Sequence, residues 1–213
     1  MKLLLLGATG LVGSETLKRA LSDDAVTKVI APTRTELPAN VKLVNPVGPR
    51  LDELMLAAMS YAPDAVICAL GTTIAKAGSK DAFRYVDYEL PLAFAKAAHA
   101  AGVGTYAIVT AMGASATSMA FYLKTKGEVE REIRAIGFRS LTICRPSLIG
   151  GERNEKRASE GVALMLFRAL APILPKKLRI NAADVIATSL LDAVAAAKTG
   201  CRWIYSQEMN SQM

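Results

Sequence analysis

Two side chains that could handle a proton stand four residues apart in the segment FYLKTKGEVE (121–130), namely Tyr122 and Lys126. Residues at this spacing share one face of a helix, whereas Lys124 would point to another side. A free tyrosine titrates at about pH 10 and a free lysine at about pH 10.4, and a nearby ammonium favours the phenolate. The pair could therefore donate a proton to the oxygen of a carbonyl substrate, or remove one from an alcohol.

A YxxxK pair is also common on amphipathic helices with a packed tyrosine and a solvated lysine, so its surroundings decide between the two interpretations. Thr110 ends an apolar run upstream of the pair and could hold the substrate oxygen, with Ser115 in the same loop as the competing hydroxyl. The other charged residues of the segment are expected to face solvent: Lys124, Glu128, Glu130 and Arg131.

A glycine-rich turn near the amino terminus could bind the cofactor that such a proton donor needs. In LLLLGATGLVGSETL three glycines recur at every third residue, after a predicted strand and at the start of a predicted helix. This arrangement lets the main chain approach a pyrophosphate at the positive end of the helix dipole. The alternative is a merely tight turn between strand and helix. The residues predicted to bind the pyrophosphate are Gly7, Thr9, Gly10, Leu11, Val12 and Gly13.

The end of the second predicted strand, VIAPTR, indicates which dinucleotide is preferred. A site for NAD usually has an acidic residue there, which binds the ribose hydroxyl. In this chain Thr33 and Arg34 follow the strand, and Glu36 lies further into the loop. A guanidinium at this point would attract the 2′-phosphate of NADP. We therefore predict NADP in preference to NAD, with an ordinary surface arginine as the alternative.

Apolar runs of strand length alternate with helix-length segments, which predicts an α/β fold: a Rossmann-type, doubly wound parallel sheet of about seven strands with helices on both faces. Strands are expected at 2–7, 27–31, 41–44, 64–70, 105–110, 139–145 and 201–206. Helices are expected at about 11–22, 51–61, 82–101, 117–136, 159–171 and 183–197. At the end of the fourth predicted strand, Ala69, Leu70 and Gly71 would lie where the chain passes the adenosine and inner ribose, a place that favours small side chains.

The chain length of 213 residues predicts one domain over 1–213. The alternation becomes irregular at about 146–181, and we place a small substrate-side excursion there, since such sheets bind ligands beyond the carboxyl ends of their strands. The apolar stretch at 161–174 is shorter than the roughly 20 residues that a bilayer requires, so no membrane span is predicted. Its helix is apolar nearly all round and could pack against the pocket or a second subunit, which leaves both a monomer and a homodimer open.

Composition narrows the possible ligands. The net charge of +7 comes from basic residues spread along the chain, so we expect a small anionic ligand and no nucleic-acid partner. The cysteines Cys68, Cys144 and Cys201 lie far apart without a CxxC spacing, which is typical of a reducing compartment, and a cytoplasmic location is predicted. The lone histidine, His99, has no second histidine or cysteine nearby, so no metal site is expected.

Four segments in order resemble landmarks of the short-chain dehydrogenase/reductase superfamily, in particular its small atypical members similar to the Tat-interacting-protein-like oxidoreductases. They are GATGLVG (7–13), TTIAKAGSKDAFRYVDYELP (72–91), FYLKTKGEVE (121–130) and CRPSLIGGER (144–153). The resemblance spans nearly the whole chain.

The resemblance implies that Tyr122 and Lys126 are the catalytic pair, with Lys126 also holding the nicotinamide ribose. It further implies that a short segment after the sixth strand presents its backbone to the nicotinamide amide, namely Pro146, Ser147 and Leu148.

At the position of the superfamily's usual serine this chain departs from the pattern and has Thr110 followed by Ala111. The resemblance also draws attention to Lys76 and Asp87, for which a loop lysine and a helix-surface acid are equally reasonable interpretations.

The sequence thus favours an NADP-dependent oxidoreductase that transfers a hydride between nicotinamide and a small carbonyl or alcohol. One alternative is a redox-responsive regulatory or scaffold protein that keeps the nucleotide site with little or no turnover. Another is an enzyme similar to the sugar-nucleotide epimerases, which would need a larger carboxyl-terminal region than the stretch after Cys144 provides.

Overall fold

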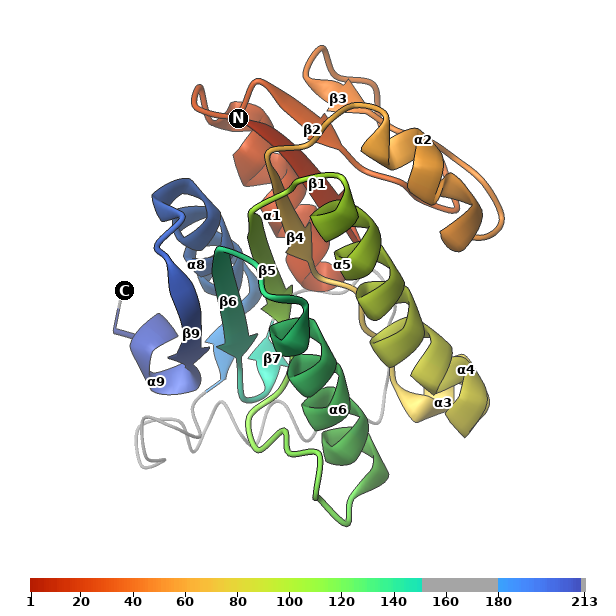
Figure 1. Cartoon of the computed structure of the whole chain (residues 1–213), viewed down its shortest axis with the longest axis vertical. Helices are drawn as coiled ribbons and strands as arrows, with labels where there is room; N and C mark the ends of the chain where they lie inside the picture. Colours follow the sequence, from red (N-terminus) through yellow and green to blue (C-terminus); the bar gives the residue numbers. More distant parts are fainter. Residues whose placement is uncertain (151–179, 212–213) are drawn as a thin grey trace.

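A computed structural model of the chain describes residues 1–150 and 180–211. Its centre is a parallel sheet of seven strands in the order β3-β2-β1-β4-β5-β6-β9 (Figure 1). The order reverses between β1 and β4, which is where sheets of this kind bind ligands. The predicted Rossmann-type sheet is confirmed. Its strands are β1 (Lys2–Leu6), β2 (Lys28–Ile30), β3 (Leu43–Val44), β4 (Ala65–Cys68), β5 (Thr105–Val109), β6 (Ser140–Arg145) and β9 (Gly200–Tyr205).

Helices cover both faces of this sheet (Figure 1). On one face lie α1 (Leu11–Ser22) and α8 (Ala183–Ala196), and on the other lie α2 (Met55–Met59), α5 (Leu90–Ala100) and α6 (Phe121–Ile136). The leucine run of β1 contributes to the hydrophobic core on both faces of the sheet, because alternate side chains of a strand point to opposite faces. Leu3 and Leu5 enter the core beneath α1 and α8, whereas Leu4 and Leu6 enter the core beneath α5 and α6.

Several short elements interrupt the regular alternation. The predicted helix at 82–101 begins earlier than expected and is formed by α4 (Lys80–Arg84), a π-helical turn η2 (Tyr85–Glu89) and α5. The helix predicted at about 51–61 is formed by η1 (Asp52–Leu54) and α2. Elements that the sequence did not predict are α3 (Ile74–Ala77), β7 (Ile149–Gly150), β8 (Asn181–Ala182) and α9 (Ser206–Met209). The helix predicted at 159–171 and most of the excursion predicted at 146–181 lie outside the described residues.

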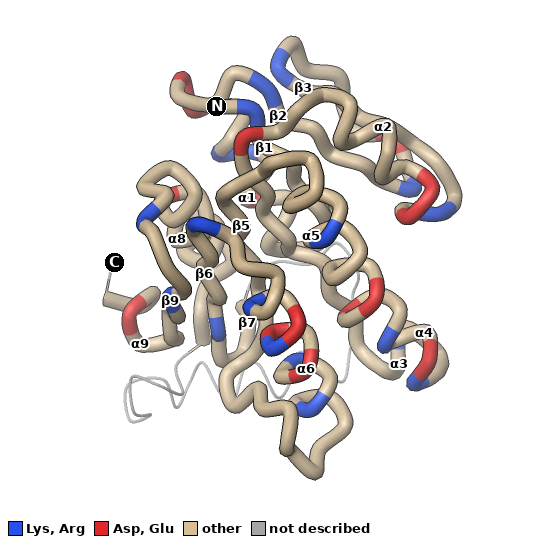
Figure 2. Tube along the Cα trace, viewed as in Figure 1, with Lys and Arg blue, Asp and Glu red and all other residues tan. Residues whose placement is uncertain are grey.

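Residues of both charge signs are interspersed along the described chain (Figure 2). Within residues 1–150 and 180–211, no helix combines the length and the hydropathy that crossing a bilayer requires. The same residues contain no cluster of three or more potential metal ligands of the His, Cys, Asp or Glu type.

Candidate functional site

The glycine turn brings β1, α1 and β4 closer together than side chains would allow. Gly7 has a φ of +84°, and a Cβ atom there would lie 2.6 Å from the carbonyl oxygen of Ala69. A Cβ atom at Gly13 would lie 1.9 Å from the carbonyl oxygen of Gly7. Gly10 is less confined, since its Cβ atom would meet the Gly7 oxygen at 3.3 Å. Gly7 and Gly13 therefore shape the turn, while Gly10 keeps its outer surface open.

The first turn of α1 forms the floor of this opening. Gly10 is the N-cap residue, no side chain caps the helix, and its first turn contains no acidic residue. Thr9 and Gly10 are exposed, Leu11 is half-buried, and Val12 is buried. Because the first amides of a helix lack intrahelical partners and carry the positive end of the dipole, this cradle fits a pyrophosphate.

At the end of β2, Thr33 and Arg34 have different environments. The buried Thr33 hydroxyl donates to the carbonyl oxygen of Thr35 at 2.7 Å and accepts from Asn45 Nδ2 at 2.7 Å. Arg34 is exposed. Thr33 therefore stabilises the loop, and Arg34 carries the charge that could meet a ligand. Asn45, which no sequence pattern selected, also donates to the carbonyl oxygen of Ala31 at 2.6 Å.

The loop after β4 runs from the glycine turn to the lysine of α6. Ala69 donates its N–H to the Leu6 carbonyl at 2.9 Å, beside the Gly7 contact. Leu70 is buried, whereas Gly71 is exposed. A Cβ atom at Gly71 would lie 3.8 Å from Lys126 Nζ. The predicted cofactor-binding loop therefore connects the glycine turn with the predicted catalytic helix.

Tyr122 and Lys126 lie on α6, as their spacing predicted, but in different environments. Tyr122 is 37% exposed, and its ring centroid is 5.7 Å from that of the buried Phe83. Lys126 is buried, and its Nζ lies 2.7 Å from Asp87 Oδ1. Burial lowers the pKa of Lys126, but attraction by Asp87, with a smaller contribution from Tyr122, outweighs it and leaves the pKa raised. Lys126 is thus an ammonium held beside the exposed phenol.

Thr110 lies directly after β5, and its hydroxyl faces α6. The hydroxyl donates to Glu130 Oε1 at 2.6 Å, and Arg145 Nε donates to the same oxygen at 3.0 Å. A second bond runs from Arg145 Nη2 to Glu130 Oε2. The expectation that Glu130 faces solvent is wrong: the side chain is buried because it lies on the Tyr122–Lys126 face of the helix, eight residues from the tyrosine. In this structure the Thr110 proton is therefore held by Glu130.

Ser115, the competing hydroxyl, is exposed, and its Oγ lies 3.0 Å from Thr117 Oγ1. Its backbone crosses α6 so closely that a Cβ atom at Gly127 would lie 2.1 Å from the Ser115 carbonyl carbon. Ser115 N–H also donates to the carbonyl oxygen of Leu123 at 3.1 Å. The loop is thus fixed to the first turns of the helix that carries Tyr122.

The segment predicted to meet the nicotinamide amide is fixed by bonds within the protein. The Pro146 carbonyl accepts from Met112 N–H at 2.8 Å, and the Leu148 carbonyl accepts from Asn181 N–H at 2.9 Å. Ser147 N–H donates to Asn181 Oδ1 at 2.9 Å. Asn181 is fully buried and was not selected from the sequence, because its partners are distant along the chain.

A protein-family model described as NAD(P)H-binding matches residues 7–193. The chain belongs to this family. The match begins at the first glycine of the turn and spans the loop after β4 and the Tyr122–Lys126 helix. Membership in the NAD(P)H-binding family confirms the nucleotide-binding character that the glycine turn predicted.

Several fungal proteins are similar to this chain in sequence. A protein of Aspergillus clavatus is 34% identical over 206 residues, covering 92% of this chain and 88% of its own. A protein of Candida albicans is 36% identical over 160 residues, which cover 73% of this chain and 70% of the relative. Both are named "Protein FMP52, mitochondrial". The prediction of a cytoplasmic location is wrong by this comparison, because the cysteine pattern indicates only reducing conditions and does not identify the compartment.

Solved structures confirm the fold. MoeE5 in complex with UDP-glucose and NAD superimposes with a TM-score of 0.73 at 17% identity, covering 99% of this chain and 80% of that one. The UDP-glucose 4-epimerase of Thermus thermophilus, in complex with NAD, superimposes with a TM-score of 0.71 at 15% identity. The match covers 98% of this chain and 81% of the epimerase chain. The resemblance to short-chain dehydrogenases/reductases is therefore confirmed at the level of an NAD(P)-binding Rossmann domain.

Proposed function

We propose that this chain is an NADP-dependent oxidoreductase that transfers a hydride between nicotinamide and a small carbonyl or alcohol substrate. The observation that carries the proposal is the continuous path from the glycine turn to the lysine. Gly7 lies against Ala69, and Gly71, two residues later, lies against Lys126. A dinucleotide with its pyrophosphate at the first turn of α1 would extend along this loop toward Tyr122.

Tyr122 and Lys126 have separate parts in this proposal. The reduced nicotinamide, when bound, would supply the hydride to the carbonyl carbon. Tyr122 would donate its phenolic proton to the carbonyl oxygen, giving the alcohol and leaving a phenolate that regains a proton from water. The Lys126 ammonium would favour that phenolate by its charge and would bond to the nicotinamide ribose.

Thr110 has a less direct part than the sequence suggested. Because its proton is donated to Glu130, its oxygen can meet the substrate only as a hydrogen-bond acceptor in this arrangement. We therefore propose that Thr110, with Glu130 and Arg145, fixes α6 against the ends of β5 and β6. Backbone groups at Pro146, Ser147 and Leu148 would complete the nicotinamide end of the site.

The test of the proposed function is NADPH oxidation by the purified protein across a panel of aldehydes, ketones and quinones. Turnover of at least one class supports the proposal. Tight NADPH binding without turnover of any member would contradict it and favour a nucleotide-responsive regulatory protein. A sugar-nucleotide epimerase would instead interconvert UDP-sugars without net oxidation of NADPH.

The preference for NADP is tested at Arg34. Replacing Arg34 with alanine should raise the Kd for NADPH about tenfold and leave the Kd for NADH nearly unchanged, because only the 2′-phosphate gains a charge-assisted bond from this side chain. Binding is measured by fluorescence titration of each reduced cofactor.

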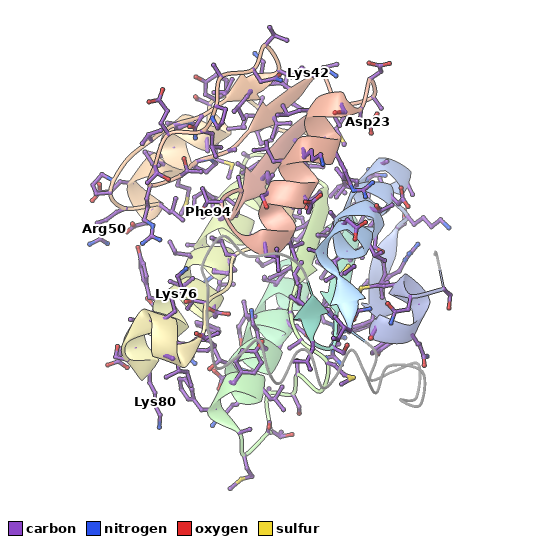
Figure 3. The ribbon with its side chains drawn as sticks, turned by 180° about the vertical axis from the view of Figure 1, so that it is seen from behind. Asp23, Lys42, Arg50, Lys76, Lys80 and Phe94 are labelled. Atoms are coloured by element: carbon purple, nitrogen blue, oxygen red, sulfur yellow. The ribbon has the colours of Figure 1, made fainter. Side chains whose placement is uncertain are left out.

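Lys42→Ala is the matched control for this titration. It also removes one positive charge, but Lys42 lies with Asp23 at the end of the molecule opposite Lys76 and Lys80 (Figure 3), and its Nζ donates to the Asp23 carbonyl at 2.9 Å. Tighter binding of NADH than of NADPH by the wild-type protein, or equal losses for both cofactors in Arg34→Ala, would contradict the proposed preference.

A further inference from the structure

Asp87 lies where three segments of the site meet. Its Oδ1 is 2.7 Å from Lys126 Nζ on α6, and its Oδ2 accepts from the Thr72 N–H at 2.9 Å in the loop after β4. The Asp87 side chain is fully buried, and 6% of the Lys126 side chain is exposed. One carboxylate therefore ties the predicted cofactor loop to the predicted catalytic helix.

The local helix geometry places this carboxylate. Asp87 is the middle residue of η2, the π-helical turn between α4 and α5, and such turns often occur at functional sites because they redirect side chains. One helical turn earlier, Phe83 of α4 packs its ring against Tyr122, with the centroids 5.7 Å apart. A single helical segment thus supports the tyrosine through Phe83 and the lysine through Asp87.

The neighbouring titratable groups do not share this role. On β4, burial raises the pKa of the Cys68 thiol to about 11, so it stays neutral at physiological pH. On β5, burial raises the pKa of Tyr106 well above its usual value, and its hydroxyl donates to the Pro91 carbonyl at 3.1 Å. The other nearby carboxylates are paired elsewhere: Glu130 of α6 binds Arg145 and Thr110, and Glu128 of α6 binds Arg84 of α4. Among the residues that the structure describes, Asp87 is therefore the carboxylate that pairs with Lys126.

A buried ion pair adds little to stability compared with well-packed apolar residues, so a charged acid at this position calls for another explanation. Without a carboxylate partner, burial would drive the lysine toward its neutral form. We propose that Asp87 is a positioning residue of the Tyr122–Lys126 pair, which keeps the Lys126 amine protonated and holds it beside the loop after β4, where it would bond to the nicotinamide ribose. This inference rests on the proposed function.

The experiment compares the pH dependence of NADPH-dependent carbonyl reduction in wild type, Asp87→Asn, Asp87→Glu and Glu128→Gln. Carbonyl reduction requires a protonated Tyr122 and a charged Lys126, and loss of either proton produces the alkaline limb of the profile. In Asp87→Asn no carboxylate offsets the positive charge of Lys126, so this charge favours loss of the Tyr122 proton more strongly. The Lys126 ammonium is also easier to deprotonate, because its carboxylate partner is gone. Both effects move the alkaline limb toward lower pH, by about one pH unit.

The other variants separate charge from packing. Asp87→Glu keeps the carboxylate, so its alkaline limb should stay at the wild-type pH even though the longer side chain lowers kcat. Glu128→Gln is the matched control: it removes one carboxylate from an ion pair that also joins α6 to the 80–89 segment, but that carboxylate bonds Arg84 rather than Lys126. Its limb should also stay at the wild-type pH. A lower kcat in Asp87→Asn with no displacement of the limb would overturn the proposal.

A second readout needs no turnover. In NMR spectra of protein labelled with ¹³C at lysine Cε, the signal absent from Lys126→Met identifies Lys126. In wild type this signal should titrate at higher pH than those of the exposed lysines, and in Asp87→Asn at lower pH. If Lys126 titrates alike in both proteins, the inference fails. If no carbonyl is turned over by wild type, the proposed function fails, whereas this titration still decides whether Asp87 controls the charge of Lys126.

Discussion

Replacing Tyr122 with phenylalanine should lower kcat for carbonyl reduction by about 10²- to 10⁴-fold, the range expected when a general acid is removed. The substitution deletes only the hydroxyl and keeps the ring against Phe83. Among the described residues this hydroxyl has no hydrogen-bond partner, so its removal costs the fold little. The thermal midpoint and the Kd for NADPH should therefore remain close to those of wild type.

The measurement combines steady-state NADPH oxidation with fluorescence titration of NADPH and thermal unfolding. Tyr61→Phe is the matched control, because Tyr61 is 38% exposed, close to the 37% of Tyr122, and lies at the opposite, amino-terminal edge of the sheet beside Lys2. Wild-type kcat in Tyr122→Phe would refute the catalytic assignment. A rise in KM alone would show that Tyr122 binds substrate without acting in the chemical step.

The sequence predicted the framework of this site well because the framework depends on local signals. The leucine run of β1 and the three glycines after it specify a strand, a turn and a helix within the first 22 residues, and the structure has all three. The i, i+4 relation of Tyr122 and Lys126 is equally local. Such patterns follow from helix and strand periodicity and need no knowledge of distant contacts.

The contacts that tune the site depend on the tertiary structure and were therefore missed or left open. Asp87 and Lys126 form an ion pair although they are 39 residues apart in the sequence, and the hydrogen-bonded Asn181 and Ser147 are 34 residues apart. No short-range pattern encodes those distances. Glu130 is different, since its burial could have been predicted: it continues the face of Tyr122 and Lys126 by one more helical turn. The compartment could not be predicted at all, because it is not set by the fold.

Gly127 offers a test of how tightly the site loop is fixed to α6. In the middle of a helix, replacing glycine with alanine normally stabilises the protein by about 1 kcal/mol. Here the new Cβ atom would lie 2.1 Å from the Ser115 carbonyl carbon and 2.2 Å from the Ala116 nitrogen, both backbone atoms. We expect Gly127→Ala to lower the free energy of unfolding by about 3 kcal/mol, because either the loop or the helix must shift.

Denaturant unfolding of wild type and Gly127→Ala measures this difference, with Gly104→Ala as the control. At Gly104 the added Cβ atom would approach only the Arg139 side chain, at 3.4 Å, so its free energy of unfolding should change by less than about 1 kcal/mol. A gain in stability for Gly127→Ala would mean that helix propensity outweighs the contact. The 111–118 loop would then be free to move away from α6, and Tyr122 would lack the fixed position that proton transfer requires.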